Sequence, residues 1–306
     1  MPPEAAAAEP TLDVSIILPV YNEAEHLEQE VARVRAAMDA SSYSYEIIVV
    51  DDGSSDNSAE IAARIPNIRF IHFLQNRGSG SARKAGTSAA HGRVTVWTDV
   101  DMTYPNDTIP ELVKELDGYD QVVGARTTEE GTVKALRVPA KWLIRKLASF
   151  LTGTKIPDLN SGFRAFRTDV ARQYLNQLPV GFSCVTTITM TFLANGYSVK
   201  YVPIDYAKRA GESKFHWYKD TQRYATQVVR MILSYNPLKI FMPVGLTLFT
   251  VGFVKLLFDV TGRHIHVATT TLLILFAAFQ VVAIGLLADL VTRSTRARGE
   301  APPASA

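Results

Sequence analysis

The chain has 306 residues, and its 32 Lys and Arg against 30 Asp and Glu give a net charge of +2. This balance, without any dense basic tract, argues against a general nucleic-acid-binding protein. The single cysteine, Cys184, excludes an internal disulfide and suits a reducing compartment. Residues 1–12 show neither the basic start nor the apolar core of a signal peptide, so we expect a disordered tail there.

Short apolar runs alternate with helical periodicity over residues 14–125. The expected strands are 14–20, 46–50, 68–74, 94–98 and 121–125, with helices over 24–40, after 58, over 79–90 and over 108–116. This alternation predicts parallel βαβ units in an open α/β sheet with flanking helices. Ligands of such sheets bind beyond the carboxyl ends of the strands.

Polar residues follow four of these predicted strands. They are Tyr21-Asn22-Glu23, Asp51-Asp52, Asp99-Val100-Asp101 and Arg126. The turn after the first strand, LPVYNEAE, has no glycine and so is not the GxGxxG of a dinucleotide-binding fold. The stretch GSGSARKAG (78–86) lacks the GKS or GKT ending of a phosphate loop, and we interpret it as a tight turn that leads into a helix.

The acids Asp99 and Asp101 are two residues apart, so in an extended chain both carboxylates point the same way. Two carboxylates at this spacing suit a hard divalent cation, Mg²⁺ or Mn²⁺, that also holds a diphosphate. The alternative is that they cap a helix or form a turn, which is commoner for an isolated pair. The acids at neighbouring strand ends favour the metal site.

The last quarter of the chain is strongly apolar. Residues 238–258 and 267–292 are each long enough to cross about 30 Å of hydrocarbon as a helix, and Lys255 can reach the interface. The alternative, two buried helices of a soluble domain, would show a polar stripe that these stretches lack. The flanking basic residues predict cytoplasmic chain ends and an outside connection. These residues are Arg223, Arg230, Lys239, Arg293, Arg296 and Arg298.

Four motifs together resemble one known family. They are YNEAEHL (21–27), VVDDGSSDNS (49–58), the DVD of WTDVDMTYPND (97–107) and DLNSGFRAFR (158–167). Their order and spacing are similar to those of glycosyltransferase family 2, which has a GT-A fold. More narrowly, the chain resembles the polyprenyl-phosphate hexosyltransferases, namely the dolichol-phosphate mannose synthases and the bacterial bactoprenol glucosyltransferases. The resemblance covers about residues 14–214, and the two apolar spans match the bacterial members.

For the donor, the resemblance implies a site for a GDP- or UDP-hexose. It assigns the base and ribose to Pro19, Tyr21, Glu23 and Asp52, and leaves Asp51 a structural role.

It assigns the cation and the diphosphate to Asp99 and Asp101. Thr103 stands where the mannose synthases have a glutamine, so either Thr103 or a water would be the third ligand. RAGESK (209–214) resembles a mobile loop that closes on the diphosphate through Arg209 and Lys214, although alone it would be a solvated basic turn.

For the acceptor, the resemblance implies polyprenyl phosphate. Arg126 and Arg137 match arginines that hold its phosphate, Lys141 replaces a serine of that group, and Ser161 is assigned to the same phosphate. Asp158 is expected to face the reacting sugar, with a turn or N-cap role as the alternative. A lipid phosphate is already anionic at neutral pH, so it needs alignment and charge neutralisation more than a general base.

The expected organisation is a tail (1–12), a cytosolic GT-A domain (13–215), an amphipathic juxtamembrane helix (216–237), two transmembrane helices (238–292) and a cytosolic tail (293–306). The stretch 217–235 alternates apolar and basic positions, which is typical of an interfacial helix, with a core-facing helix as the alternative.

The leading hypothesis is therefore an inverting transferase at the cytoplasmic face of the cell membrane. It would move mannose or glucose to undecaprenyl or decaprenyl phosphate. An inactive nucleotide-sugar-binding scaffold and a processive polysaccharide synthase are the alternatives, although the chain has no QxxRW motif. We expect a homo-oligomer, because two helices are few for a stable membrane bundle, and no nucleic-acid partner.

Overall fold

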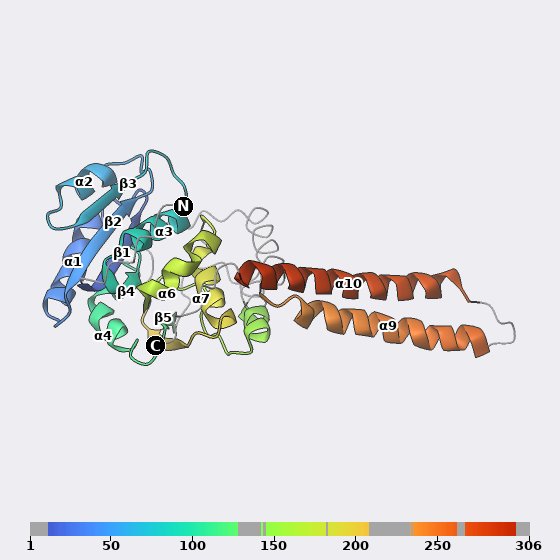
Figure 1. Cartoon of the computed structure of the whole chain (residues 1–306). Coiled ribbons are helices and arrows are strands. Elements are labelled where there is room, and N and C mark those ends of the chain that lie inside the picture. Colours follow the sequence, from blue (N-terminus) through green and yellow to red (C-terminus); the bar gives the residue numbers. More distant parts are fainter. Residues whose placement is uncertain are drawn as a thin grey trace, which may run out of the picture. The chain divides into compact units, whose positions relative to one another are not determined.

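The computed structural model describes residues 12–127, 142, 145–181, 183–207, 233, 235–261 and 267–297. The chain divides into two compact units. We call them the sheet unit (Met1–Arg145 and Thr154–Phe215) and the hairpin unit (Lys146–Gly153 and His216–Ala306). Figure 1 labels their helices and strands.

The sheet unit is built on a mostly parallel sheet whose described strands run in the order β3-β2-β1-β4-β6-β5-β7. Strand β6 is antiparallel to both β4 and β5, and the other neighbours pair in parallel. The strands are β1 (Leu12–Val20), β2 (Tyr45–Asp51), β3 (Arg69–His72), β4 (Gly92–Trp97), β5 (Gln121–Arg126), β6 (Arg164–Arg167) and β7 (Val199–Ile204). The parallel strands β1 to β5 confirm the predicted α/β sheet, whereas the antiparallel insertion of β6 was not predicted.

Helices cover both faces of this sheet (Figure 1). One face packs against α1 (Leu27–Asp39), α2 (Ser58–Arg64) and α4 (Ile109–Lys114), and the other against α3 (Ser79–Ala89), α6 (Thr168–Tyr174) and α7 (Cys184–Ala194). The residues of β1 alternate between the two cores: Ile16 and Leu18 belong to the first, and Ile17 to the second. Burial on both faces explains the continuous apolar runs of the sequence.

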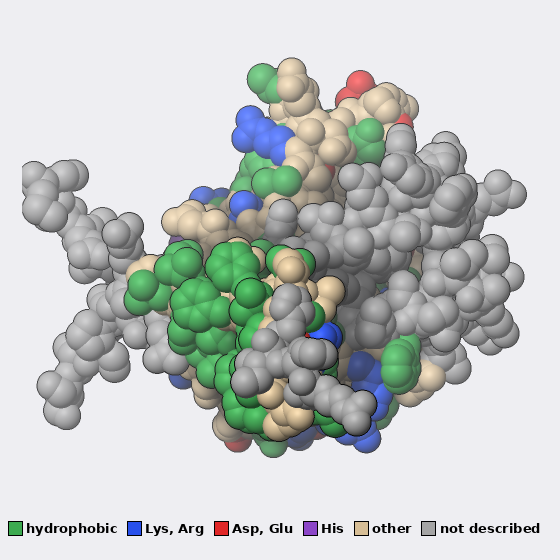
Figure 2. All heavy atoms as spheres, turned by 90° about the vertical axis from the view of Figure 1, so that its right-hand side faces the viewer, with side chains coloured by type: hydrophobic (Ala, Val, Ile, Leu, Met, Phe, Trp, Pro, Cys, Tyr) green, Lys and Arg blue, Asp and Glu red, His purple; other side chains and the backbone are tan. Residues whose placement is uncertain are grey.

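The hairpin unit contains two long apolar helices, α9 (Leu238–Thr261) and α10 (Thr269–Ala297). Both are long and apolar enough to cross a membrane, and only 11% and 17% of their apolar windows are buried. Figure 2 shows hydrophobic side chains over the outer surface of this hairpin. The helices approach closely at glycines, because a Cβ on Gly245 would lie 2.5 Å from Val282 and one on Gly285 would lie 2.6 Å from Phe241.

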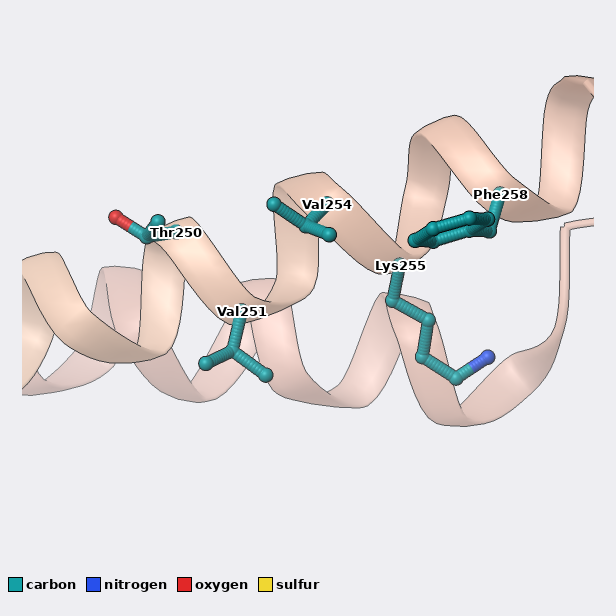
Figure 3. A pocket seen from close by; sticks show the side chains of 5 residues that line it. All are labelled: Thr250, Val251, Val254, Lys255 and Phe258. Atoms are coloured by element: carbon teal, nitrogen blue, oxygen red, sulfur yellow. The ribbon is translucent and has the colours of Figure 1, made fainter.

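A polar cluster joins the ends of α9 and α10 near their connection. Asp259 accepts hydrogen bonds from Thr271 Oγ1 (2.5 Å), Ala268 N (3.0 Å) and Lys255 Nζ (3.2 Å). Lys255 therefore pairs within the hairpin. Figure 3 shows the open groove beside it on α9, where Val251, Val254 and Phe258 make the lining mostly apolar. This groove belongs to the hairpin unit, not to the strand ends.

Candidate active site

The carboxyl ends of β1, β2, β4 and β5 lie at one edge of the sheet. Strands β1, β2 and β4 pair in parallel, and β5 has the same direction because β6 is antiparallel to both β4 and β5. The polar residues that follow these strands therefore converge, as expected for an open α/β sheet.

The turns after β1 and β2 are hydrogen-bonded to each other. Asn22 accepts from Ser55 N at 2.8 Å through its side chain, and its backbone N–H donates to Ser54 Oγ at 3.0 Å. Its φ of 56° lies in the left-handed region, which Asn tolerates better than most residues. The other residues that we assigned to the base and ribose lie in or beside this turn. Tyr21 is exposed and Pro19 is half-buried within β1. The backbone N–H of Glu23 donates to Ser58 Oγ. This edge of the site is thus a fixed turn with an exposed aromatic ring.

The two acids at the end of β2 have separate partners. Asp51 is buried, accepts a hydrogen bond from Ser54 Oγ at 2.5 Å and contacts His72 Nδ1 at 2.9 Å. Asp52 is also buried and accepts from Arg77 N at 2.8 Å. Burial raises the pKa of Asp52, while the backbone N–H groups of Arg77 and Gly78 act in the opposite direction. In this structure Asp52 fixes the loop that leads into α3.

The acids of the DVD motif lie on a turn. Strand β4 ends at Trp97, and the backbone bends at residues 100–102, where Met102 has a φ of 60°, so Asp99 and Asp101 do not lie on an extended strand as we expected. Asp101 Oδ1 accepts from Thr103 Oγ1 at 2.5 Å and from Thr103 N at 3.3 Å. The Thr103 hydroxyl therefore orients Asp101 in this structure.

Asp99 is bound by an arginine that lies behind it. Arg83 of α3 donates from Nη2 to Asp99 Oδ1, is 1% exposed, and has its guanidinium 5.8 Å from the ring centroid of Trp97. The Nε and Nη1 atoms of Arg83 have no hydrogen-bond partner among the described residues. A Cβ on Gly162 would lie 2.8 Å from Asp99 Oδ2, so the chain after Asp158 approaches the same carboxylate.

A second buried arginine, Arg164, fixes that chain. It donates to Val185 O (2.6 Å), to Thr189 Oγ1 (2.7 Å) and to the carbonyl of Ser161. Burial lowers the pKa of Arg164 to about 10, and the nearby charge of Arg83 adds to this effect. Among the described residues no carboxylate pairs with Arg164, so a positive charge lies behind this edge and favours an anionic ligand.

The DVD turn is also held from α1. Asn106 donates to Glu30 Oε2 at 2.6 Å and to the carbonyl of Asp99 at 3.1 Å, and it accepts from Thr98 Oγ1 at 2.5 Å. Glu30 is buried, and this burial raises its pKa. The turn is therefore tied to helices on both faces of the sheet.

Arg126, at the end of β5, forms a bidentate ion pair with Asp158. Its Nε lies 2.7 Å from Oδ2 and its Nη2 lies 3.0 Å from Oδ1, and the guanidinium lies 5.2 Å from the ring centroid of Tyr206. Although burial alone would raise the pKa of Asp158, the hydrogen bonds and charge of Arg126 hold it below its ordinary value. Two residues that we assigned to acceptor and sugar thus bind each other.

The remaining predicted residues of the acceptor and donor sites divide into two groups. Ser161 is fully buried, and its Oγ accepts from Phe163 N at 3.3 Å. Arg137, Lys141, Arg209 and Lys214 lie outside the described residues.

Comparison with known proteins identifies the family. The profile described as "Glycosyl transferase family 2" matches residues 15–175. The chain is 32% identical over 299 residues to an undecaprenyl-phosphate 4-deoxy-4-formamido-L-arabinose transferase of Photorhabdus laumondii, covering 92% of this chain and 89% of that protein. The chain belongs to glycosyltransferase family 2.

Other comparisons agree with this family 2 assignment. A protein of the same name from Edwardsiella ictaluri is 36% identical over 212 residues, which cover 66% of this chain and 62% of that protein. The profile described as "GtrB C-terminal hairpin" matches residues 236–294. A structure of glucosyl-3-phosphoglycerate synthase from Mycobacterium tuberculosis with Mn²⁺, UDP and phosphoglyceric acid has a TM-score of 0.57 at 21% identity, covering 75% of this chain and 80% of that chain. This likeness shows the shared GT-A fold.

The site of this family 2 glycosyltransferase suits a divalent cation that is also held by its substrate. Among the described residues no three His, Cys, Asp or Glu side chains are grouped as a self-sufficient metal site. Asp101 supplies carboxylate oxygens, whereas Asp99 is bound by Arg83. One or two carboxylates completed by substrate phosphates and water are an ordinary set for Mg²⁺. The residues therefore fit a cation that binds together with a diphosphate.

Our sequence analysis missed Arg83, which it placed on a helix without a function. A signal was present, because the small residues Gly80, Ala82 and Gly86 mark the buried side of α3 and Arg83 belongs to the same buried set. A charged residue on a buried helix face requires a partner. Here the partner is an acid at the end of the neighbouring strand.

Proposed function

We propose that this glycosyltransferase moves a sugar from a nucleotide sugar to the phosphate of a polyprenyl phosphate at the cytoplasmic face of a membrane. The observation that carries the proposal is a combination of three features in one chain. They are the acid Asp99 after β4, held by Arg83, the largely buried Arg126 at the end of β5, and a two-helix apolar hairpin. The relatives of similar length, whose names specify undecaprenyl phosphate, support it.

For the donor, the exposed Tyr21, Glu23 and the region of Asp52 would hold the base and ribose. Asp101, with Asp99 beside it, would hold Mg²⁺ or Mn²⁺ together with the diphosphate, and Thr103 would orient Asp101. The bound cation would neutralise charge on the departing nucleoside diphosphate. The buried charges of Arg83 and Arg164 favour the same anion from behind.

For the acceptor, the phosphate oxygen forms the new bond to the anomeric carbon while the bond from that carbon to the diphosphate oxygen breaks. One displacement of this kind inverts the anomeric configuration. Arg126, with Arg137, Lys141 and Ser161, would align the acceptor phosphate, and Asp158 would face the sugar. Closure of Arg209 and Lys214 over the diphosphate completes this proposal.

The donor sugar is the finer part of the proposal. A hexose, mannose or glucose, carried by GDP or UDP is our first choice from the motifs. The names of the relatives specify 4-deoxy-4-formamido-L-arabinose, a pentose derivative, which makes a modified pentose the second candidate.

The test uses the purified full-length protein, a panel of radiolabelled GDP- and UDP-sugars including the formamido-pentose, and undecaprenyl or decaprenyl phosphate with Mg²⁺ or Mn²⁺. We expect one donor to place its label in a chloroform-extractable lipid that mild acid cleaves. Label in an insoluble polymer would indicate a processive synthase. Nucleotide binding without transfer from any donor would indicate a scaffold. Asp101→Asn is the matched inactive control.

A further inference from the structure

Tyr104 lies directly after the DVD turn, and we assigned no role to it from the sequence. The residue is 4% exposed. Its backbone is fixed together with the turn, because its carbonyl accepts hydrogen bonds from Arg33 Nη1 of α1 at 3.2 Å and from Asn106 N at 2.9 Å. Its side chain instead contacts two segments that come from other parts of the sequence.

The hydroxyl of Tyr104 holds the chain between Asp158 and β6. It accepts a hydrogen bond from the backbone N–H of Gly162 at 2.7 Å, across 58 positions of sequence. Gly162 is closely packed there, since a Cβ on it would lie 2.8 Å from Asp99 Oδ2 and 3.3 Å from Tyr104 Cε2. Phe163 stacks on the Tyr104 ring with 5.8 Å between the centroids. Burial raises the pKa of Tyr104 and the charge of Asp99 adds to this, so the hydroxyl stays neutral and is no general base.

The ring of Tyr104 holds the chain just after β7 and, through it, Arg126. The Tyr104 and Tyr206 rings meet edge to face, with 5.1 Å between their centroids and 66° between their planes. The Arg126 guanidinium lies 5.2 Å from the ring centroid of Tyr206. The backbone is tied at the same place, because Ala207 N donates to the carbonyl of Thr103 at 3.0 Å.

We propose that Tyr104 is a positioning residue that sets the acceptor half of the active site, Arg126 and Asp158, against the donor half, the DVD turn. Its hydroxyl places the chain that follows Asp158, and its ring places Tyr206 and thereby Arg126. These segments are far apart in the sequence, so their separation in the site depends on contacts of this kind. A misplacement of about 1 Å can reduce a rate roughly a hundredfold. This role rests on the proposed function, in which the DVD turn holds the diphosphate and Arg126 the acceptor phosphate.

The first test is Tyr104→Phe in the full-length protein, which removes the hydroxyl and keeps the ring. The matched control is Tyr201→Phe on β7, because the buried hydroxyl of Tyr201 has no hydrogen-bond partner among the described residues. Calorimetric titration measures nucleotide affinity, and transfer kinetics measure kcat and KM for polyprenyl phosphate. We expect Tyr104→Phe to lower kcat/KM for polyprenyl phosphate about tenfold at constant nucleotide affinity. The control should change neither quantity.

Three outcomes would overturn the positioning role. They are an unchanged kcat/KM in Tyr104→Phe, an equal loss of nucleotide affinity in that variant, and an equal loss of kcat/KM in Tyr201→Phe. The ring contact is tested separately by Tyr206→Leu, which removes the aromatic face that contacts Arg126. We expect this variant to raise the KM for polyprenyl phosphate about fivefold and to leave nucleotide affinity unchanged. An unchanged KM would remove the ring from the proposal.

Hydrogen–deuterium exchange provides a readout that does not depend on transfer. In Tyr104→Phe the backbone amides of residues 158–163 should exchange about fivefold faster, because Gly162 N loses its acceptor, whereas those of β2 should not change. Unchanged exchange over 158–163 would show that the hydroxyl does not hold this chain. Failure of the parent protein to transfer any sugar would refute the proposed function instead, and the exchange result would still decide whether Tyr104 fixes the segment.

Discussion

Two arginine–carboxylate pairs at the active-site edge are built in opposite ways. In the first, Arg83 is buried behind Asp99, whose side chain remains 27% exposed. In the second, Arg126 and Asp158 are both largely enclosed, with side-chain exposures of 14% and 10%. An arginine anchored behind a carboxylate orients that carboxylate for a ligand. A pair closed on itself has to separate before either partner can bind a substrate.

This difference divides the site into a prepared half and a closed half. The donor edge, with Asp99 held by Arg83 and its carbonyl held by Asn106, is already organised. The acceptor side, if Arg126 and Asp158 have the roles that we propose, becomes available only when their pair opens. The predictions below alter each half in turn.

The largest effect is expected from Asp101→Asn, which removes a carboxylate of the prepared half. A neutral amide is a poorer ligand for a hard cation. We expect a loss of transfer of about a hundredfold or more, with a higher Mn²⁺ or Mg²⁺ requirement. Rates measured against metal concentration check this. Full activity at ordinary metal concentrations would remove Asp101 from the metal site.

Arg126→Ala breaks the closed pair and removes a charge-assisted contact to the acceptor. Such contacts are worth about 1.5–3 kcal/mol, which is roughly ten- to a hundredfold in rate. The variant also leaves Asp158 buried without its partner, which costs about 3–5 kcal/mol of unfolding free energy. The double variant Arg126→Ala/Asp158→Asn should regain stability but not activity. Recovery of both would show that Arg126 only balances the charge of Asp158.

Arg83→Lys tests the anchored pair. An ammonium keeps the positive charge but cannot reproduce the planar guanidinium that contacts Asp99 and Trp97. We expect nucleotide affinity to fall about tenfold, while the KM for the acceptor stays unchanged. Calorimetric titration of nucleotide alongside transfer kinetics checks this split. An increase in acceptor KM at constant nucleotide affinity would show that Arg83 serves the acceptor half of the site and not the donor half.

Asp158→Asn should separate binding from turnover. It removes the carboxylate that competes with the acceptor phosphate for Arg126, so we expect the acceptor KM to fall severalfold, by about 1 kcal/mol. The maximal rate should fall at the same time, because the sugar loses a contact. Saturation curves with polyprenyl phosphate measure both parameters. If the maximal rate falls while the acceptor KM stays unchanged, the pair does not have to open for binding.

The smallest effect concerns Glu30, which supports the prepared half through Asn106. Burial raises its pKa above the ordinary 4.5, so its protonated form is favoured in the folded state. The stability that this form contributes is fully present below pH 4.5 and is lost as pH rises through the raised value. Glu30→Gln should flatten this dependence by at most about 1.4 kcal/mol per pH unit. Denaturant titrations from acid to neutral pH compare the slopes, and parallel curves would contradict the prediction.

The parts of the fold that follow from local pattern could be predicted from the sequence. Strands β1 to β5 were recognised as apolar runs, and the polar residues of the site were recognised because they directly follow these runs. Both patterns depend only on residues that are neighbours in the sequence. Strand β6 was missed because its position between β4 and β5 depends on pairing across more than 60 residues, as in the pair Val94 and Arg167.

The candidate site divides in the same way. A site at Asp99 and Asp101 was predicted from their spacing, although these acids follow β4, which ends at Trp97, and lie where the backbone bends. The partner of Asp99 could not be found from spacing, since Arg83 lies 16 residues earlier on a helix. Nor could spacing show that Arg126 and Asp158, 32 residues apart, bind each other.

The hairpin unit joins Lys146–Gly153 to helices that follow much later in the chain, and this has a consequence for synthesis. Lys239 of α9 donates a hydrogen bond to the carbonyl of Leu151, and the two residues are separated by 88 positions. At about 5–20 residues per second, the helical residues 145–152 are synthesised roughly 4 to 18 seconds before Lys239, which holds them. During that interval Ala148 and Leu151, which are buried in the folded chain, have no hairpin to pack against. The nascent chain therefore carries an uncovered apolar segment that a chaperone or the membrane surface has to shield.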